Sequence, residues 1–249
     1  MCTKRKWSLM FIKILKHELG SIKRDKMYSF FVGYLLLFFV VSIFLFPYLK
    51  DQPNPETTIL MVFILFLLMN GFIFGAITGF TLLDNKDDNV LLSLQVTPID
   101  VNMYIFFKLL ICFIFSLIST TSLVFIANIS SGISVVSFIM TIFLASLQGP
   151  IIALIMNVFA SNKVEGFVVM KISGLLLIGP ILSLFLTDWT EFFIGLFPGF
   201  WPSRILTMDF YNSSYTFSSP YIYFILGLFV NGLFILNLLN FYKKKNNLS

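Results

Sequence analysis

The chain has 249 residues, of which 58% are apolar and only 12% are charged. A water-soluble domain is roughly 45–50% apolar and about 25% charged, so this chain lacks the charge that a soluble surface needs. We therefore predict an all-α integral membrane protein, with residues 1–249 forming a single transmembrane domain. One histidine and two cysteines exclude a multi-histidine metal site and a spaced disulfide framework. We read the net charge of +5 as a sign of membrane topology, not of nucleic-acid binding.

The first 27 residues are basic and amphipathic. Apolar side chains recur there at intervals near three and four, with basic side chains between them: Trp7, Phe11, Ile14, Leu15 and Ile22. This spacing places one face of a helix in lipid and leaves the cations at the headgroups. We expect an interfacial helix on the inner leaflet that leads into the first span. The alternative is a basic anchor that only sets topology.

Six apolar stretches are long enough to cross a bilayer, since a spanning helix needs about 20 residues at about 1.5 Å each. They cover residues 28–49, 57–83, 104–128, 134–160, 166–187 and 221–242. Gln148-Gly149-Pro150 and Gly179-Pro180 should break the fourth and fifth spans, because proline removes a helical hydrogen bond and clashes with the preceding turn.

Orientation follows from the positions of the cations. Fifteen of the 17 Lys and Arg residues lie in the terminal segments or near the second and fourth links, and only Lys50 and Arg204 lie on the other side. Positively charged loops stay in the cytoplasm. We expect a multi-pass protein of the cell membrane, bacterial in origin, with both termini cytoplasmic.

The link after the second span begins with acids and becomes apolar. Acids favour the N-terminal end of a helix, and the residue before a proline is pushed out of helical geometry. The sequence therefore predicts a short cytoplasmic helix from about Lys86 to Val96, with Val90, Leu91 and Leu94 on its apolar side. An exposed apolar face indicates a binding partner. A solvated connector is the alternative.

The external segment from Asp188 to Pro220 is rich in aromatic residues: Trp189, Phe192, Phe193, Phe197, Phe200, Trp201, Phe210 and Tyr211. Pro198, Gly199 and Pro202 interrupt it. Aromatic side chains prefer the membrane interface. The segment is too short to span twice, so we expect a re-entrant hairpin that dips into the outer leaflet before the sixth span. A passive interfacial cap is the alternative.

The order of motifs resembles the permeases of the ABC-2 type transporter family. In those permeases a Leu-Leu pair and Thr-Pro precede a Tyr and a Lys that open the third span, and this chain has Leu91-Leu92, Thr97-Pro98, Tyr104 and Lys108. Further matches are Asn162-Lys163-Val164-Glu165-Gly166, Lys171, Gly179-Pro180 and Phe197-Pro198-Gly199-Phe200-Trp201-Pro202. The chain is most similar to small bacterial permeases of the fluoroquinolone-export type. It departs from the pattern where Asp84, Lys86, Asp87 and Asp88 replace a basic, glutamate-rich lead.

The resemblance implies two functional elements. The first is a coupling helix, seated in a cleft of a separate ATP-hydrolysing subunit that holds ATP and Mg²⁺. Its residues here are Asp87, Asp88, Val90, Leu91, Leu94, Thr97 and Pro98. The second is an external gate at the centre of a permease dimer, formed by Phe197, Phe200 and Trp201.

The sequence lacks a nucleotide-binding motif and acids within the spans, which limits the functions that the chain can have. The chain has no G-x-x-x-x-G-K-[ST] phosphate loop, so energy from ATP has to come from a partner. All twelve acids lie at span ends or in links, which argues against an intramembrane enzyme and against a proton-coupled antiporter. Polar residues within the spans usually bond between helices or back to their own helix, and the others could line a translocation path. The polar residues are Asn70, Thr78, Ser116, Ser119, Thr120, Thr121, Gln148, Asn157, Asn231 and Asn237.

The sequence thus predicts a permease subunit of an ATP-driven exporter for a hydrophobic or amphipathic compound, either a drug or a toxic peptide. The expected partners are ABC ATPase subunits, a second copy or a related permease, and membrane lipid, with no nucleic acid. We expect this chain to bind no cofactor or metal itself. The alternative is a non-transporting immunity or sensor protein that binds a toxin or partner.

Overall fold

The computed structural model describes residues 14–16, 20, 25–52, 55–88, 90, 101–129, 133–186, 188–211, 213 and 215–246. In these ranges all regular structure is helical, and six helices are long and apolar enough to cross a membrane. The all-α membrane fold is therefore confirmed. Most of the expected interfacial helix, and the link residues 91–100, lie outside the described residues.

Four of the spans are single helices: α2 (Lys26–Lys50), α3 (Pro55–Asp87), α5 (Val101–Ala127) and α12 (Pro220–Lys245). The fourth span consists of α6 (Val135–Ser146) and α7 (Gln148–Phe159). The fifth consists of α8 (Lys163–Ser173), the 3₁₀ helix η1 (Gly174–Leu177) and α9 (Ile178–Leu182). Two further helices, α10 (Glu191–Ile194) and α11 (Phe200–Tyr211), precede α12.

The breaks in the fourth and fifth spans lie where the two prolines predict them. A proline clashes with the carbonyl four residues earlier. For Pro150 that residue is Ser146, at which α6 ends, and for Pro180 it is Leu176, which lies in η1. Each predicted proline site therefore interrupts its span, by a break between two α-helices in the fourth span and by a 3₁₀ segment in the fifth.

Three glycines on α3 bring it into close contact with α7. A Cβ on Gly75 would lie 2.6 Å from the carbonyl oxygen of Gly149, and one on Gly71 would lie 2.9 Å from the carbonyl oxygen of Ala145. Gly79 faces α7 in the same way, and its carbonyl accepts a hydrogen bond from Nδ2 of Asn157 at 3.0 Å. Small residues spaced four apart allow two helix backbones to approach in a membrane. α3 and α7 thus form the centre of the bundle.

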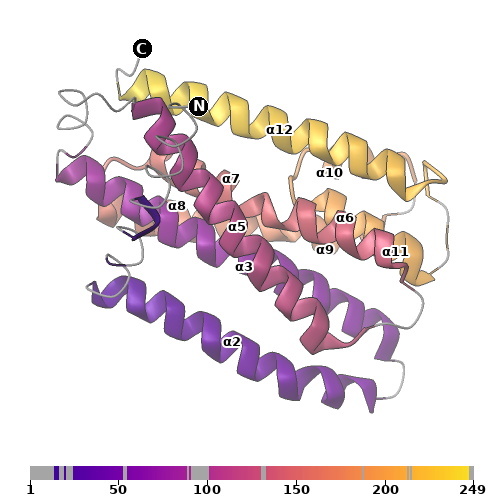
Figure 1. Cartoon of the computed structure of the whole chain (residues 1–249). Coiled ribbons are helices and arrows are strands. Elements are labelled where there is room, and N and C mark those ends of the chain that lie inside the picture. The colour runs from indigo at the N-terminus through magenta and orange to yellow at the C-terminus, as the bar shows by residue number, and fades with distance from the viewer. Residues whose placement is uncertain are drawn as a thin grey trace, which may run out of the picture.

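The outer helices are α2 and α12, which lie at opposite edges of the bundle (Figure 1). In its most apolar window α3 is 61% buried, whereas α2 and α12 are each 22% buried. Large apolar side chains cover their free faces, for example Phe44 at 73% and Phe229 at 63% exposure. Such faces suit lipid or another membrane-embedded chain.

One end of the bundle, which we call the basic end, holds the start of α2, the end of α3, the start of α8 and the end of α12. Lys163 forms ion pairs there with Asp25 at 3.2 Å and with Asp84 at 2.8 Å. Nζ of Lys245 donates to the carbonyl oxygens of Val158 at 2.9 Å and of Ala160 at 2.5 Å, where α7 ends. A cation at a helix C-terminus stabilises the carbonyls left without partners.

At the opposite end, polar contacts connect the loops. Nζ of Lys50 donates to the carbonyl oxygen of Asn128 at 2.9 Å, which joins the ends of α2 and α5. The hydroxyl of Tyr211 donates to that of Thr57 at 3.0 Å and ties the end of α11 to the start of α3. The end of α11 therefore marks the end of the bundle away from the basic residues.

Candidate functional site

The candidate site is formed by α11, which lies inside the bundle. Residues 200–208 of this helix are all buried, and it packs against α6, α9 and α12 (Figure 1). Twelve residues give a helix about 18 Å long, well short of a membrane span. The helix begins next to Pro198, whose carbonyl accepts from Asn231 near the midpoint of α12, and ends at the opposite end with Tyr211. It thus occupies only half the depth of the bundle.

The three expected gate residues lie close together at the start of this helix. Phe200 is 1% and Trp201 is 4% exposed, and their rings meet edge to face at a centroid distance of 5.2 Å. Nε1 of Trp201 donates to the carbonyl oxygen of Gly195 at 3.1 Å, which fixes the indole. Phe197 is half-buried and packs so closely on α9 that a Cβ on Gly179 would lie 2.6 Å from its ring. The sequence therefore identified residues that lie together.

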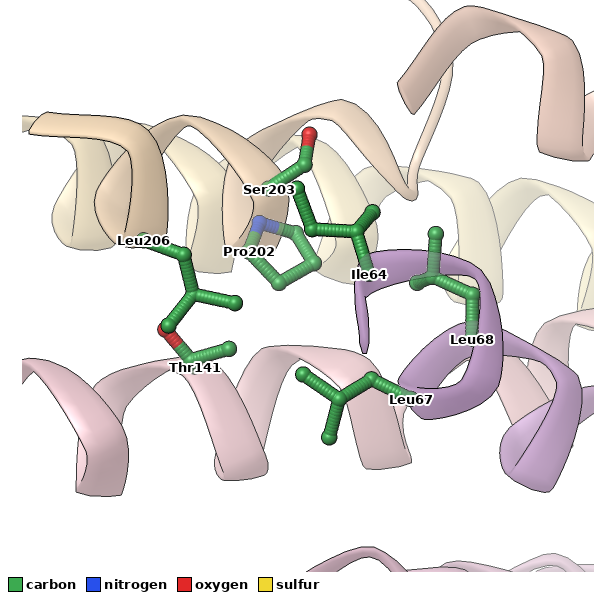
Figure 2. A pocket seen from close by; sticks show the side chains of 7 residues that line it. All are labelled: Ile64, Leu67, Leu68, Thr141, Pro202, Ser203 and Leu206. Carbon is green, nitrogen blue, oxygen red and sulfur yellow. The ribbon is translucent and has the colours of Figure 1, made fainter. Parts of the chain in front are cut away.

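A small crevice separates α11 from α3 and α6, and Figure 2 shows the side chains that line it. They are Ile64, Leu67 and Leu68 of α3, Thr141 of α6, and Pro202, Ser203 and Leu206 of α11. The space between them has no room for a water-sized sphere. Except for the hydroxyls of Thr141 and Ser203, these side chains are apolar. The contact between α11 and the bundle is therefore dry and closed in this conformation.

A buried ion pair joins α10 to α11. Nε of Arg204 lies 2.8 Å from Oε2 of Glu191, and both side chains have 0% exposure. Nη2 of Arg204 also donates to the carbonyl oxygen of Leu186 at 2.5 Å. The hydroxyl of Tyr223, on α12, donates to Oε1 of Glu191 at 2.6 Å. Each charge thus has a charged partner and a further hydrogen bond, which is the arrangement that makes a buried ion pair tolerable.

Aromatic rings surround the guanidinium of Arg204. Its central carbon lies 4.0 Å from the ring centroid of Tyr215 and 5.3 Å from that of Phe200. Ring faces carry a negative quadrupole that attracts a cation, more so when water is excluded. Arg204 therefore links Phe200, one of the expected gate residues, to Tyr215 in the loop before α12.

Sequence reasoning missed this ion pair. It placed Arg204 among the external cations and Glu191 among the acids in links, whereas both are fully buried. A signal was present, because Glu191 and Arg204 are the only charged residues in the apolar stretch 189–208. A single acid and a single base in a stretch that enters the bundle have a strong reason to pair.

Of the expected coupling residues, the structure describes Asp87, Asp88 and Val90, which lie at or just after the end of α3. Asp87 ends α3 and Asp88 follows it, and both are exposed, while Val90 is half-buried. Leu91, Leu94, Thr97 and Pro98 lie outside the described residues. Lys86 and Asp87 belong to the last turn of α3, and not to the separate short helix that was expected to begin at about Lys86.

Lys163 connects this part of α3 to α2 and α8. The hydroxyl of Tyr28 donates to Asp84, and Lys163 lies between Asp84 and Asp25. A hydrogen bond from the backbone N–H of Met27 is the main cause that lowers the pKa of Asp25 below its ordinary value. Burial acts in the other direction, and Lys163 adds to the lowering. These contacts join the end of α3 to the starts of α2 and α8.

Several polar residues within the spans bond between helices. Oγ of Ser119 donates to Oδ1 of Asn70 at 2.8 Å between α5 and α3. Nε2 of Gln148 donates to Oδ1 of Asn231 at 3.2 Å between α7 and α12. For these residues, the helix-bonding interpretation is confirmed.

Taken with the apolar helices, this architecture defines a multi-pass helical membrane protein with a short aromatic helix enclosed in its bundle. Among the described residues no group of His, Cys, Asp and Glu could hold a metal ion. The family profile for Rv2686c-like fluoroquinolones export permease proteins matches residues 18–239. The chain therefore belongs to that family of membrane permeases.

Two relatives come from Mycobacterium tuberculosis. They are fluoroquinolones export permease protein Rv2686c of strain H37Rv and protein MT2760 of strain CDC 1551. Each is 25% identical to this chain over 141 residues, which is 56% of the chain. The match also spans only 56% of the length of each relative. No solved structure matches the chain.

Proposed function

We propose that the chain is the permease subunit of an ATP-driven ABC exporter that moves a hydrophobic or amphipathic compound out of the cell. The observation that carries the proposal is the position of α11, a short aromatic helix held inside a bundle of membrane-spanning helices. A helix that spans only half the bundle contributes little to anchoring. Its burial instead suits a re-entrant element that closes a path from the outer side.

The relatives' names support the class of compound. They are called fluoroquinolones export permeases, and a fluoroquinolone is one candidate for this chain, beside other amphipathic drugs and toxic peptides. A compound of this kind needs an apolar path with few fixed polar groups. The crevice between α3, α6 and α11 has that composition, and it would widen if α11 moved outward.

The energy source in this proposal is a separate ATPase that binds the link after α3. On this view the basic end is cytoplasmic, and Leu91 and Leu94 dock into the ATPase. A movement of the link would be carried by α3 to α11, because Leu68 of α3 contacts the start of α11. A Cβ on Gly199 would lie 3.2 Å from Cδ1 of Leu68.

A second permease would complete the path. The free faces of α2 and α12 offer apolar surface for another membrane-embedded chain. Phe197, Phe200 and Trp201 would then act as the outer gate beside that interface.

The test is purification of the full-length, tagged chain from its native membrane, followed by an ATP-hydrolysis assay. We expect an ABC ATPase to copurify and its hydrolysis to rise when a fluoroquinolone is added. The double variant Leu91→Asp/Leu94→Asp should lose the ATPase, because docking would bury two charges without partners. Its folding is checked by gel filtration. Copurification that survives the double variant would refute the coupling role. A chain that binds the drug without any ATPase would favour the immunity or sensor alternative.

A further inference from the structure

We propose that the Glu191–Arg204 ion pair is a latch that holds α11 in the closed position and opens when water reaches the pair. The inference rests on the proposed function, since opening of α11 would be the step that releases the exported compound. It assigns a role to two residues that lie outside the expected gate.

The pair is placed where it can control α11. Glu191 comes from α10, Arg204 is the fifth residue of α11, and Tyr223, which donates to Glu191, is in the first turn of α12. Arg204 also holds the carbonyl of Leu186 in the preceding loop. One ionic contact therefore fastens α11 both to the segment that enters the bundle and to the last span. α11 cannot move outward without separating these groups.

The pair lies toward the end of the bundle opposite the basic end. Tyr223, which donates to Glu191, is only three residues after Pro220, where α12 begins. Outward movement of α11 would carry Arg204 toward the water at that end. Hydration would then compensate for the separated ion pair.

This chemistry explains why charges occupy the position. Burying each ion costs several kcal/mol, and apolar residues of the same volume would often hold the closed state equally well or better. Exposing an apolar contact to water, however, raises the free energy of the open state, whereas two separated ions regain their hydration there. An ion pair therefore keeps the closed and open states closer in free energy than an apolar contact would.

One donor of Arg204 supports this interpretation. Its Nη1 is buried and has no hydrogen-bond partner among the described residues, whereas Nη2 donates to the carbonyl oxygen of Leu186 and Nε, which also makes no hydrogen bond, lies in the ion pair with Glu191. A buried donor without an acceptor raises the free energy of the closed state. Water satisfies this N–H as soon as α11 moves outward, which favours opening further.

The test measures exposure of α11 with a thiol probe. Ser203 lies next to Arg204, is 1% exposed and lines the closed crevice, so Ser203→Cys reports outward movement. The reporter is placed in the full chain with Cys2 and Cys112 replaced by serine, in cells that also contain the ATPase. A membrane-impermeant maleimide is added from outside, with and without depletion of ATP.

We expect slow labelling of the reporter chain without ATP and faster labelling with ATP. Glu191→Gln should label at least tenfold faster without ATP, because Arg204 loses its counter-charge. Tyr223→Phe removes one hydrogen bond to Glu191 and should label several-fold faster, which covers the case that Glu191→Gln does not fold. Asp188→Asn is the matched control, since it removes an exposed carboxylate three residues away and should label like the parent.

The double variant Glu191→Leu/Arg204→Met tests the reason for the charges. It should fold, label as slowly as the parent without ATP and show no acceleration with ATP. The latch is refuted if folded Glu191→Gln and Tyr223→Phe both label as slowly as the parent, or if the double variant accelerates with ATP as the parent does. Faster labelling of Glu191→Gln, with no effect of ATP on the parent, would support the latch and contradict the ATP-driven function instead.

Discussion

The contact between α3 and α7 gives the sharpest prediction about stability. A Cβ on Gly75 would lie 2.6 Å from the carbonyl oxygen of Gly149 and 2.8 Å from Cβ of Ile152. Neither atom belongs to the flexible end of a side chain, so Gly75→Ala has to push the two helices apart. Overpacking of this kind costs about 1–3 kcal/mol. Separation would also weaken the contact at Gly71, which lies one turn away on the same face.

Gly232→Ala is the matched control, because a Cβ at Gly232 would meet nothing within 4 Å. Alanine is also the better helix former, so this change should be neutral or slightly stabilising. Thermal unfolding of the purified chain in lipid nanodiscs measures both variants. At about 2–4 °C per kcal/mol, Gly75→Ala should lower Tm by several degrees while Gly232→Ala does not. Equal Tm values for the two variants would refute the close contact of α3 and α7.

Three further predictions concern the basic end, the start of α11 and the topology. Because the pKa of Asp25 is lowered from 3.8, its carboxylate stabilises the fold above that pH and loses this effect as the pH falls through the lowered value. Asp25→Asn, which keeps the cap, should therefore lower Tm at pH 7 but not at pH 2, and an equal effect at both would contradict the charge's role. The double variant Phe200→Ala/Trp201→Ala should insert and keep its ATPase, yet leak a fluorescent amphipathic compound in an efflux assay; unchanged efflux and leak in a well-expressed protein would favour a passive cap. A cysteine at Gln52 should react with an impermeant maleimide in intact cells and one at Asn246 should not, whereas the reverse pattern would invert the topology.

The spans could be predicted from sequence because they depend on local properties. Apolar runs of sufficient length fix the positions of α2, α3 and α12, and the clash of a proline with the residue four earlier fixes the breaks near Pro150 and Pro180. These features need no knowledge of what packs beside them. The aromatic segment around Phe200 was identified for the same reason, from its composition and its Pro-Gly interruptions.

The ion pairs could not be predicted because they depend on the packing of distant segments. Asp84 and Lys163 are 79 residues apart and meet only because the end of α3 lies beside the start of α8. Glu191 and Arg204 are closer in sequence, but irregular chain separates them, so no helical spacing predicts their contact. The close approach at Gly75 likewise depends on which face of α7 it meets. Sequence thus indicated the candidate segment, and the structure supplied the contacts that hold it.

We propose above that this chain moves an amphipathic compound out of the cell with energy from ATP hydrolysis. Inverted membrane vesicles that contain the chain and its ATPase test it directly, because the cytoplasmic side then faces the medium. The account predicts that a fluoroquinolone accumulates inside these vesicles when ATP is added, and that accumulation is lost with Leu91→Asp/Leu94→Asp while the membrane level of the chain is unchanged. The proposal would be contradicted if vesicles in which the chain is bound to an active ATPase accumulate no fluoroquinolone and no other amphipathic drug or peptide.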